Sequence, residues 1–276
     1  MNLWIIARVT FLEVTRRKIL WTAFLAAIAF LALFGTGVHF QELDLRHSQI
    51  NPLIRNQIFA TILQVGFYAV DMLAVIMTVL ISVDTISGEI ASSTIHAMAT
   101  KPLARWEILI GKWLGYACMI AAFVALAFGG VVAIGHFIAH VDPRGSWHGA
   151  LLIYFECLVV LSTTFLFGTW FTTLTNGVIV LGMHGLAFIG GWLEQIGVVT
   201  HSNRLIDIGI VSSLILPTEA IWRRAAYVMQ SALGRSMELS PFGSRSAPSG
   251  WMLLYAGVYL VVCLALALRR FQSRDL

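Results

Sequence analysis

Long apolar runs separated by shorter polar stretches make up most of this sequence. A helix needs about 20 predominantly apolar residues to cross about 30 Å of hydrocarbon. Runs of that character predict six membrane-spanning helices, over residues 19–38, 66–83, 109–134, 150–171, 177–196 and 251–268. We therefore expect an all-α fold, a polytopic membrane protein with six transmembrane helices in which residues 1–276 form a single membrane domain.

The first 18 residues precede the apolar runs and predict a helix of their own. Ile5, Val9 and Leu12 fall on one helical face, but Arg8 and Arg16 intrude on it. A weakly amphipathic helix that ends in a basic cluster is typical of the membrane interface. The apolar run that follows is long, and the charges lie well inside the chain. We therefore expect an uncleaved first span rather than a removed signal peptide.

Two long polar stretches and one short one, residues 135–149, separate spans on the side away from this helix. Residues 39–64 carry charges of both signs and the pair Asn51-Pro52, which predicts a loop. Residues 197–250 are longer and contain an apolar stretch, 205–216, that is too short to cross a bilayer.

After this short stretch, Pro217-Thr218-Glu219 predicts the start of a helix. Trp222 and Ala226 share one face of that helix, and Arg223 lies on the other. An apolar face opposite a polar face predicts a helix lying on the outer membrane surface.

Basic residues in the short polar stretches predict the orientation. One side of the membrane would carry most of them: Arg8, Arg16, Arg17, Lys18, Lys101, Arg105, Lys112, Arg269, Arg270 and Arg274. We expect this side to be cytoplasmic, with both termini and residues 84–108 on it, in a multi-pass protein of the inner (cytoplasmic) cell membrane.

Composition supports a membrane location and argues against a nucleic-acid-binding protein and against a disulfide or zinc framework. Hydrophobic residues make up 58% of the chain, and the mean hydropathy is +0.83. A soluble domain has about 45–50% apolar residues. The net charge of +4 is explained by basic anchors at the membrane surface, so we expect no nucleic-acid partner. Cys118, Cys157 and Cys263 all lie in apolar runs without a C-x-x-C pair, which argues against disulfides and zinc.

Motifs for nucleotide binding and hydrolysis are absent from the sequence. Gly111-Lys112 is followed by Trp113 and lacks the upstream glycine of a P-loop, and neither H-E-x-x-H nor G-x-S-x-G occurs. We therefore expect no catalytic residues and no cofactor in this chain. Asp71, Glu156, His184 and Glu194 are the few ionisable residues in or near the spans. They keep open the alternative of an ion-coupled secondary transporter.

Histidines gather in the stretches assigned to the outer side. His136 and His140 are four residues apart, a spacing that allows two imidazoles to share a metal ion. No nearby thiolate or methionine cluster supports copper. We expect these histidines to be loop residues and predict no metal site.

Residues 84–108 form the longest polar interruption on the side assigned to the cytoplasm. Ser87 can cap a helix with Glu89 in its first turn, and Pro102 ends that helix and fits the first turn of the next. Arg105 and Lys112 can lie near lipid phosphates. A helix, sharp turn and second helix at the surface suit docking of a soluble partner. The alternative is a solvated loop with ordinary membrane anchors.

This stretch resembles a motif of the ABC exporter permeases of the second type, a family that includes permeases similar to the nitrous-oxide-reductase maturation type. The matching residues are Glu89, Thr94, Pro102, Arg105, Trp106, Glu107, Gly111 and Lys112, with Ser93 where the family often has glycine. The resemblance extends over the N-terminal helix, the six spans and the long segment before the last span.

The resemblance implies a permease subunit of an ATP-driven exporter. Two permease copies, identical or closely paralogous, would form the translocation path within membrane lipids, lined by the second and fifth spans. Two copies of a separate ABC ATPase would bind ATP and Mg. The coupling contact with the ATPase would involve Glu89, Thr94, His96, Lys101, Pro102 and Arg105.

The fifth span also carries four glycines that allow close helix approach, Gly182, Gly185, Gly190 and Gly191. Besides the secondary transporter, a membrane anchor or assembly factor, such as one for metalloenzyme maturation, is the other alternative function.

Overall fold

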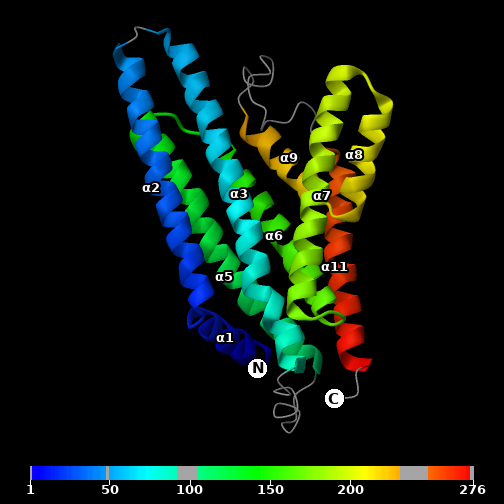
Figure 1. Ribbon diagram of the computed structural model, residues 1–276. Coiled ribbons are helices and arrows are strands. Elements are labelled where there is room, and N and C mark those ends of the chain that lie inside the picture. The colour runs from blue at the N-terminus through cyan, green and yellow to red at the C-terminus, as the bar shows by residue number, and fades with distance from the viewer. Residues whose placement is uncertain (1, 48–49, 92–104, 144, 231–247, 274–276) are drawn as a thin grey trace.

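The computed structural model describes residues 2–47, 50–91, 105–143, 145–230 and 248–273, and these ranges are mostly helical (Figure 1). The helices are α1 (Asn2–Thr15), α2 (Lys18–His47), α3 (Pro52–Ala91), α5 (Arg105–Ile134), α6 (Ser146–Gly168), α7 (Thr173–Thr200), α8 (Asn203–Ile215), α9 (Thr218–Met229) and α11 (Gly250–Ser273). A π-helical turn, η1 (Gly135–Ala139), extends α5. No strand occurs in these ranges.

Six helices in the described ranges are long and apolar enough to cross a membrane: α2, α3, α5, α6, α7 and α11. The two termini lie at the same end of the bundle, which we call the terminal end; the other is the far end (Figure 1). The predicted all-α, six-span membrane fold is confirmed.

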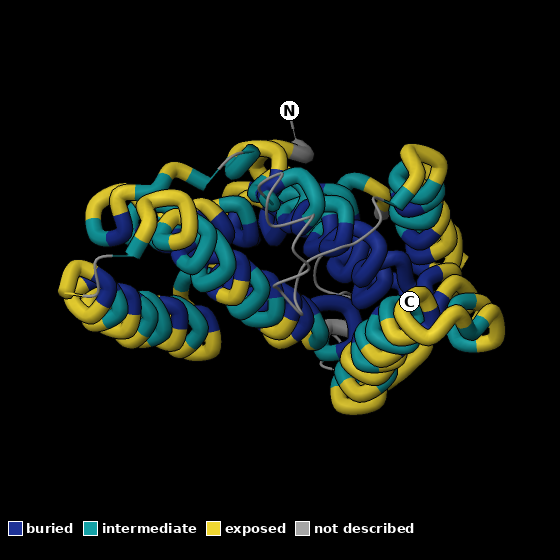
Figure 2. The backbone as a smooth tube through the Cα atoms, turned by 90° about the horizontal axis from the view of Figure 1, so that it is seen from above, coloured by how far each residue is buried: buried dark blue, intermediate teal, exposed yellow. Residues whose placement is uncertain are grey.

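Helices α3 and α6 form the centre of the bundle. In each of them 61% of the most apolar stretch is buried, against 11% in α2 and 17% in α11. Aromatic rings fill the interior; Phe67 of α3 stacks on Phe128 of α5 with ring centroids 4.4 Å apart. Seen along the bundle, buried residues gather in the middle and exposed ones cover the periphery (Figure 2). The apolar periphery matches a surface that faces lipid or a second membrane subunit.

Helix α1 lies across the terminal end and packs against α5 (Figure 1). A side chain at Gly115 of α5 would place its Cβ 2.8 Å from the carbonyl oxygen of Ala7 and 2.8 Å from Cβ of Thr10. Only glycine therefore allows the two helices to cross this closely. The opposite face of α1 exposes Trp4, which is 72% accessible.

The predicted loop over residues 39–64 is wrong, because most of this stretch is helical. Helix α2 continues to His47, and α3 begins at Pro52. Asn51 caps the start of α3, since its Oδ1 accepts a hydrogen bond from the backbone N–H of Leu53 at 2.9 Å. The charges that suggested a loop pair with each other between the helices. At 1.5 Å per residue α3 is about 60 Å long, twice the hydrocarbon thickness, so it extends well beyond the lipid tails.

Helices α7, α8 and α9 form the second half of the far end. Helix α8 returns along α7, and a Cβ at Gly209 would lie 2.7 Å from the carbonyl oxygen of Gly190. Helix α9 then turns by 107° from α8. The helix predicted after Pro217 is present, but its placement on the membrane surface is wrong. Both Trp222 and Arg223 are buried, because Arg223 pairs with an acid of α7 instead of facing water.

Candidate functional site

A polar junction joins three parts of the chain at the terminal end. Arg17, between α1 and α2, pairs with Glu13 at 3.1 Å and with Asp84 of α3 at 3.6 Å. Thr173, at the start of α7, donates a hydrogen bond to Asp84 Oδ1 at 3.1 Å and lies 2.8 Å from the hydroxyl of Ser87. Asp84 therefore connects the α1–α2 corner to the start of α7.

The groups around Arg17 at this junction favour its charged form. Partial burial lowers the pKa of the guanidinium, but the hydroxyl of Tyr116 and the carboxylates of Glu13 and Asp84 together raise it above its ordinary value. The guanidinium is therefore a permanent cation between α1 and α3.

The helices on either side of residues 92–104 are longer than the sequence suggested. Residues 84–91 continue α3, and residues 105–108 begin α5. Ser87 does not cap a helix start; its hydroxyl donates to the carbonyl of Val83 within α3 at 2.9 Å. No helix-breaking proline occurs between 84 and 91, so the helix carries on past the junction around Asp84.

Lys112 does not lie at the lipid headgroups as the sequence suggested. It is 4% exposed beneath α1, where it interacts electrostatically with Glu13 and Arg17. The next residue, Trp113, donates its indole N–H to Ser162 of α6 at 3.1 Å. The start of α5 is therefore fixed both to α1 and to the central helix α6.

Two fully buried carboxyl groups face each other in the middle of the bundle. Asp71 lies halfway along α3 and Glu156 lies on α6, close enough for the two carboxyl groups to interact electrostatically. No N–H or O–H donor of the other described residues reaches their carboxyl oxygens. Burial without donors and the nearness of a second acid both oppose the ionisation of these two groups together.

Further charges continue from this acidic pair toward the far end. Glu219 of α9 interacts with both Glu156 and Asp71, and Arg223 follows one turn later on α9. Arg223 Nη1 lies 2.6 Å from Glu194 Oε1 of α7. A buried path of ionisable groups therefore connects α3 and α6 with the α7–α9 side of the bundle.

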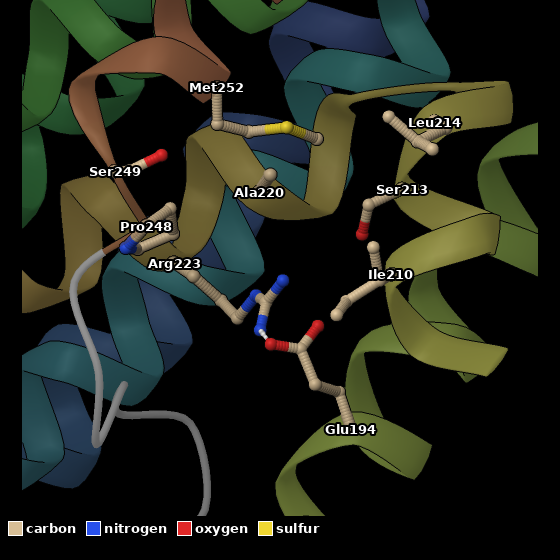
Figure 3. Close-up of a pocket in the computed structure, with 9 residues that line it drawn as sticks. All are labelled: Glu194, Ile210, Ser213, Leu214, Ala220, Arg223, Pro248, Ser249 and Met252. Atoms are coloured by element: carbon tan, nitrogen blue, oxygen red, sulfur yellow. Dashed lines mark ion pairs between the residues drawn. The ribbon is translucent and has the colours of Figure 1, made fainter. Parts of the chain in front are cut away.

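A cavity of about 160 Å³ lies at the end of this path, between α7, α8, α9 and the start of α11. Figure 3 shows the ion pair of Arg223 and Glu194 at its polar end. The other lining residues are Ile210, Ser213, Leu214, Ala220, Pro248, Ser249 and Met252. The cavity therefore has the ion pair of Arg223 and Glu194 at one end and mostly apolar side chains along its walls.

The far end also has an ion-pair cluster, built around Glu42. This residue is 3% exposed and pairs with Arg46 at 2.6 Å and Arg55 at 3.0 Å. Arg55 also donates to the carbonyl of Ala139 at 3.3 Å, which ties α2 and α3 to η1. Nearby, Nδ1 of His136 lies 2.7 Å from Oδ1 of Asp142. The part of the chain that the structure describes holds no group of three or more histidine, cysteine or acidic residues arranged for a metal.

Comparison with known proteins decides the family. The family model described as ABC-2 family transporter protein matches residues 4–276, nearly the whole chain. The chain belongs to the ABC-2 transporter family. It is therefore a permease component of an ABC transporter, a multi-pass membrane protein that is not itself the catalytic subunit and whose family works with an ATP-binding subunit. No curated protein matches the sequence significantly.

The coupling residues predicted from the sequence lie at the edges of the described ranges or outside them. Thr94, His96, Lys101 and Pro102 are outside the described residues. Glu89 lies near the end of α3 and Arg105 begins α5, and only their backbones are described. Their role in coupling stays a prediction. What the structure adds is the junction around Asp84, five residues before Glu89.

The glycines of the fifth span serve two different surfaces of this ABC-2 protein. Gly190 contacts Ser212 of α8, and Gly191 contacts Glu219 of α9, so both allow close packing within the chain. A methyl group added at Gly182 or Gly185 would meet no atom of the described residues within 4 Å, so both glycines lie toward the outside of α7. The predicted close helix approach holds inside the described chain at Gly190 and Gly191.

Sequence reasoning missed several residues that the structure brings together. The sequence pattern puts Asp84 at the edge of a loop and Arg223 on a surface. No local pattern links Asp84 to Arg17 or Arg223 to Glu194, because each pair joins helices far apart in the sequence. The one available signal was a charged residue on an otherwise apolar or amphipathic helix.

Proposed function

We propose that this chain is the permease of an ATP-driven exporter in the cytoplasmic membrane. Two permease copies pair around the translocation path, and each binds one copy of a separate ATPase that holds ATP and Mg. The contact with the ATPase lies within residues 89–105, between α3 and α5. Both termini and this contact face the cytoplasm.

The junction around Asp84 is the observation that carries this proposal. It lies five residues before Glu89, at the end of α3 that leads into the proposed contact. Through Arg17 it reaches α1 and α2, and through Thr173 it reaches α7. A movement of the ATPase against residues 89–105 is therefore passed to the first, second and fifth spans together, as a rigid-body transition requires.

Two surface features support the orientation and the pairing. Arg8, Arg16 and Lys18 are exposed at the terminal end, as are Arg269 and Arg270, in agreement with a cytoplasmic side. Helices α3 and α7 pack together through Val79 and Val180 yet leave large apolar side chains exposed, namely Ile76, Leu80, Val178 and Leu181. This face suits contact with the second permease copy and the cargo path between them.

The central experiment compares coupling variants in the reconstituted complex of permease and ATPase. Glu89→Ala and Arg105→Ala are expected to keep membrane insertion but lower the amount of cargo moved per ATP hydrolysed. Asp207→Ala and Arg204→Ala are matched controls, because both residues are exposed on α8 at the far end. Equal transport by all four variants would overturn the assignment of the coupling segment.

The orientation is tested separately in intact cells. In a variant in which Cys118, Cys157 and Cys263 are replaced by alanine, single cysteines from Arg16→Cys and Arg204→Cys are treated with a membrane-impermeant maleimide. Labelling of the second and protection of the first supports a cytoplasmic terminal end. The reverse pattern would place residues 89–105 out of reach of any cytoplasmic ATPase.

A second function is favoured by one observation, the complete burial of the acids Asp71 and Glu156 in the middle of the bundle. Buried acids in a membrane bundle also serve ion-coupled secondary transport. That function predicts transport in liposomes without ATP, driven by a proton gradient and lost in Glu156→Gln. A complex that hydrolyses ATP without any cargo stimulation would instead favour a membrane anchor or assembly factor.

A further inference from the structure

We propose that the cavity between α7, α8, α9 and α11 binds a neutral, hydroxyl-bearing amphiphile dissolved in the membrane. The site belongs to this chain alone and does not depend on the ATPase or on the direction of transport. Its polar end is the pair Arg223–Glu194 with Ser213, and its apolar walls include Ile210, Leu214 and Met252.

Unused hydrogen-bonding capacity at the polar end indicates a ligand. Among the described residues Ser213 Oγ, Arg223 Nε and Glu194 Oε2 have no hydrogen-bond partner. Ser213 is 2% exposed and Arg223 is 5% exposed, so water from outside does not solvate them freely. Buried polar groups are nearly always satisfied, by protein or by something bound. The atoms offer both donors and an acceptor, which is what a hydroxyl group needs.

The charge at this site restricts the ligand to a neutral head group. Arg223 and Glu194 are 2.6 Å apart and compensate each other's charge. An anionic head group would face the carboxylate of Glu194, and a cationic head group would face the guanidinium of Arg223. A hydroxyl group avoids both costs.

Size and surroundings favour an amphiphile over water alone. The cavity of about 160 Å³ is close to the size of an apolar cavity that holds benzene, about 150 Å³. Two wall residues, Ile210 and Leu214, are also 47% and 46% exposed on the outside of α8. Tyr255 of α11 donates to the carbonyl of Leu214 at 2.5 Å and holds the two walls together. The apolar side therefore borders the lipid-facing surface, through which a membrane-dissolved chain can enter.

The test is photolabelling of the full-length protein in phosphatidylcholine nanodiscs. The probe is octan-1-ol with a diazirine in its chain, and the matched probe is the diazirine-bearing octane. We expect the alcohol to label the segment around Ile210, Leu214 or Met252 saturably, with competition by unlabelled octan-1-ol but not by octane. Mass spectrometry locates the adduct.

Matched variants separate a built site from general lipid contact. Ser213→Ala should weaken the alcohol about fivefold, the loss expected from one hydrogen bond, whereas Ser212→Ala on the same helix should not, since that hydroxyl donates to Gly209. Met252→Trp should fill the cavity and abolish saturable labelling. Leu254→Trp, which is exposed on α11 and does not line the cavity, should leave it intact.

Three outcomes would overturn the proposal. They are the absence of saturable labelling, equal labelling by the alcohol and alkane probes, and an unchanged affinity in Ser213→Ala. Gel filtration and thermal unfolding of each variant confirm that a loss of labelling does not come from misfolding.

Discussion

Asp84 of α3 and Arg17 at the α1–α2 corner lie 3.6 Å apart, although 66 residues separate them along the chain. Both side chains are partly exposed, at 52% and 28%. An exposed pair of this kind contributes little to stability, typically about 0–1 kcal/mol. Under the proposed function, the pair acts instead as a link between helices that move together when the ATPase moves.

The first prediction concerns this link. In Asp84→Asn the Thr173 contact is kept in part, but the attraction to Arg17 is lost. We expect the free energy of unfolding to fall by no more than about 1 kcal/mol. Cargo moved per ATP should fall severalfold while ATP hydrolysis continues. Asp207→Asn serves as the control, and normal coupling in Asp84→Asn would show that the pair transmits nothing.

The second prediction is that Asp71 and Glu156 retain a shared proton at neutral pH, because both acids are fully buried. The infrared spectrum of the wild-type protein at neutral pH should contain the C=O stretching band of a protonated carboxyl group. Glu156→Gln should remove or shift this band, and so should Asp71→Asn. Each amide replaces a protonated acid with a similar shape, so thermal unfolding should change little. A spectrum without any protonated carboxyl band would contradict the shared proton.

The third prediction concerns the crossing of α1 and α5. Gly115→Leu should displace α1 and destabilise the protein by about 1–3 kcal/mol, because the backbone of Ala7 cannot make room for a side chain. Gly129→Ala is the matched control in the same helix, since nothing lies within 4 Å of the added methyl position. That variant should be neutral or slightly stabilising, because alanine favours the helix. Thermal unfolding in detergent distinguishes the two, and equal values would mean that α1 does not pack as described.

The fourth prediction compares two arginines around Glu42. Arg55→Ala should cost more stability than Arg46→Ala, because Arg55 also donates to the carbonyl of Ala139 and lies over the ring of Phe59 at 5.2 Å. Arg46 is 61% exposed and contributes as a surface pair does. The free energy of unfolding of each variant, measured by denaturation, checks this order. The opposite order would indicate that η1 is held by other contacts.

The sequence revealed those features that depend on a local pattern. Apolar runs predicted the six spans because lipid requires about 20 apolar residues per crossing wherever the helix stands in the bundle. The weak amphipathicity of residues 1–18 likewise predicted a separate helix before the first span. The family motif around Glu89 and Arg105 pointed to the class that the family comparison confirms.

Features that depend on pairing between distant helices could not be predicted in this way. The charges near Glu42 indicated a loop, because the sequence does not show which of them pair. Once Glu42 pairs with Arg46 and Arg55, the same charges are compatible with long helices that extend beyond the hydrocarbon core of the membrane. Arg223 indicated a surface helix for the same reason. Its partner Glu194 is on another helix, and only the fold brings the two side chains within 2.6 Å.

The burial of α9 has a consequence for how the protein is made. This 12-residue helix carries Glu219 and Arg223, so it is too short and too polar to enter a bilayer unaided. Most of its docking place is formed by α6 and α7, which precede it during synthesis, and α11, which follows it, completes the site. Biogenesis should therefore pass through an intermediate in which the preceding spans are inserted and α9 is still undocked at the membrane surface. Cellular quality control should recognise variants in which this intermediate persists.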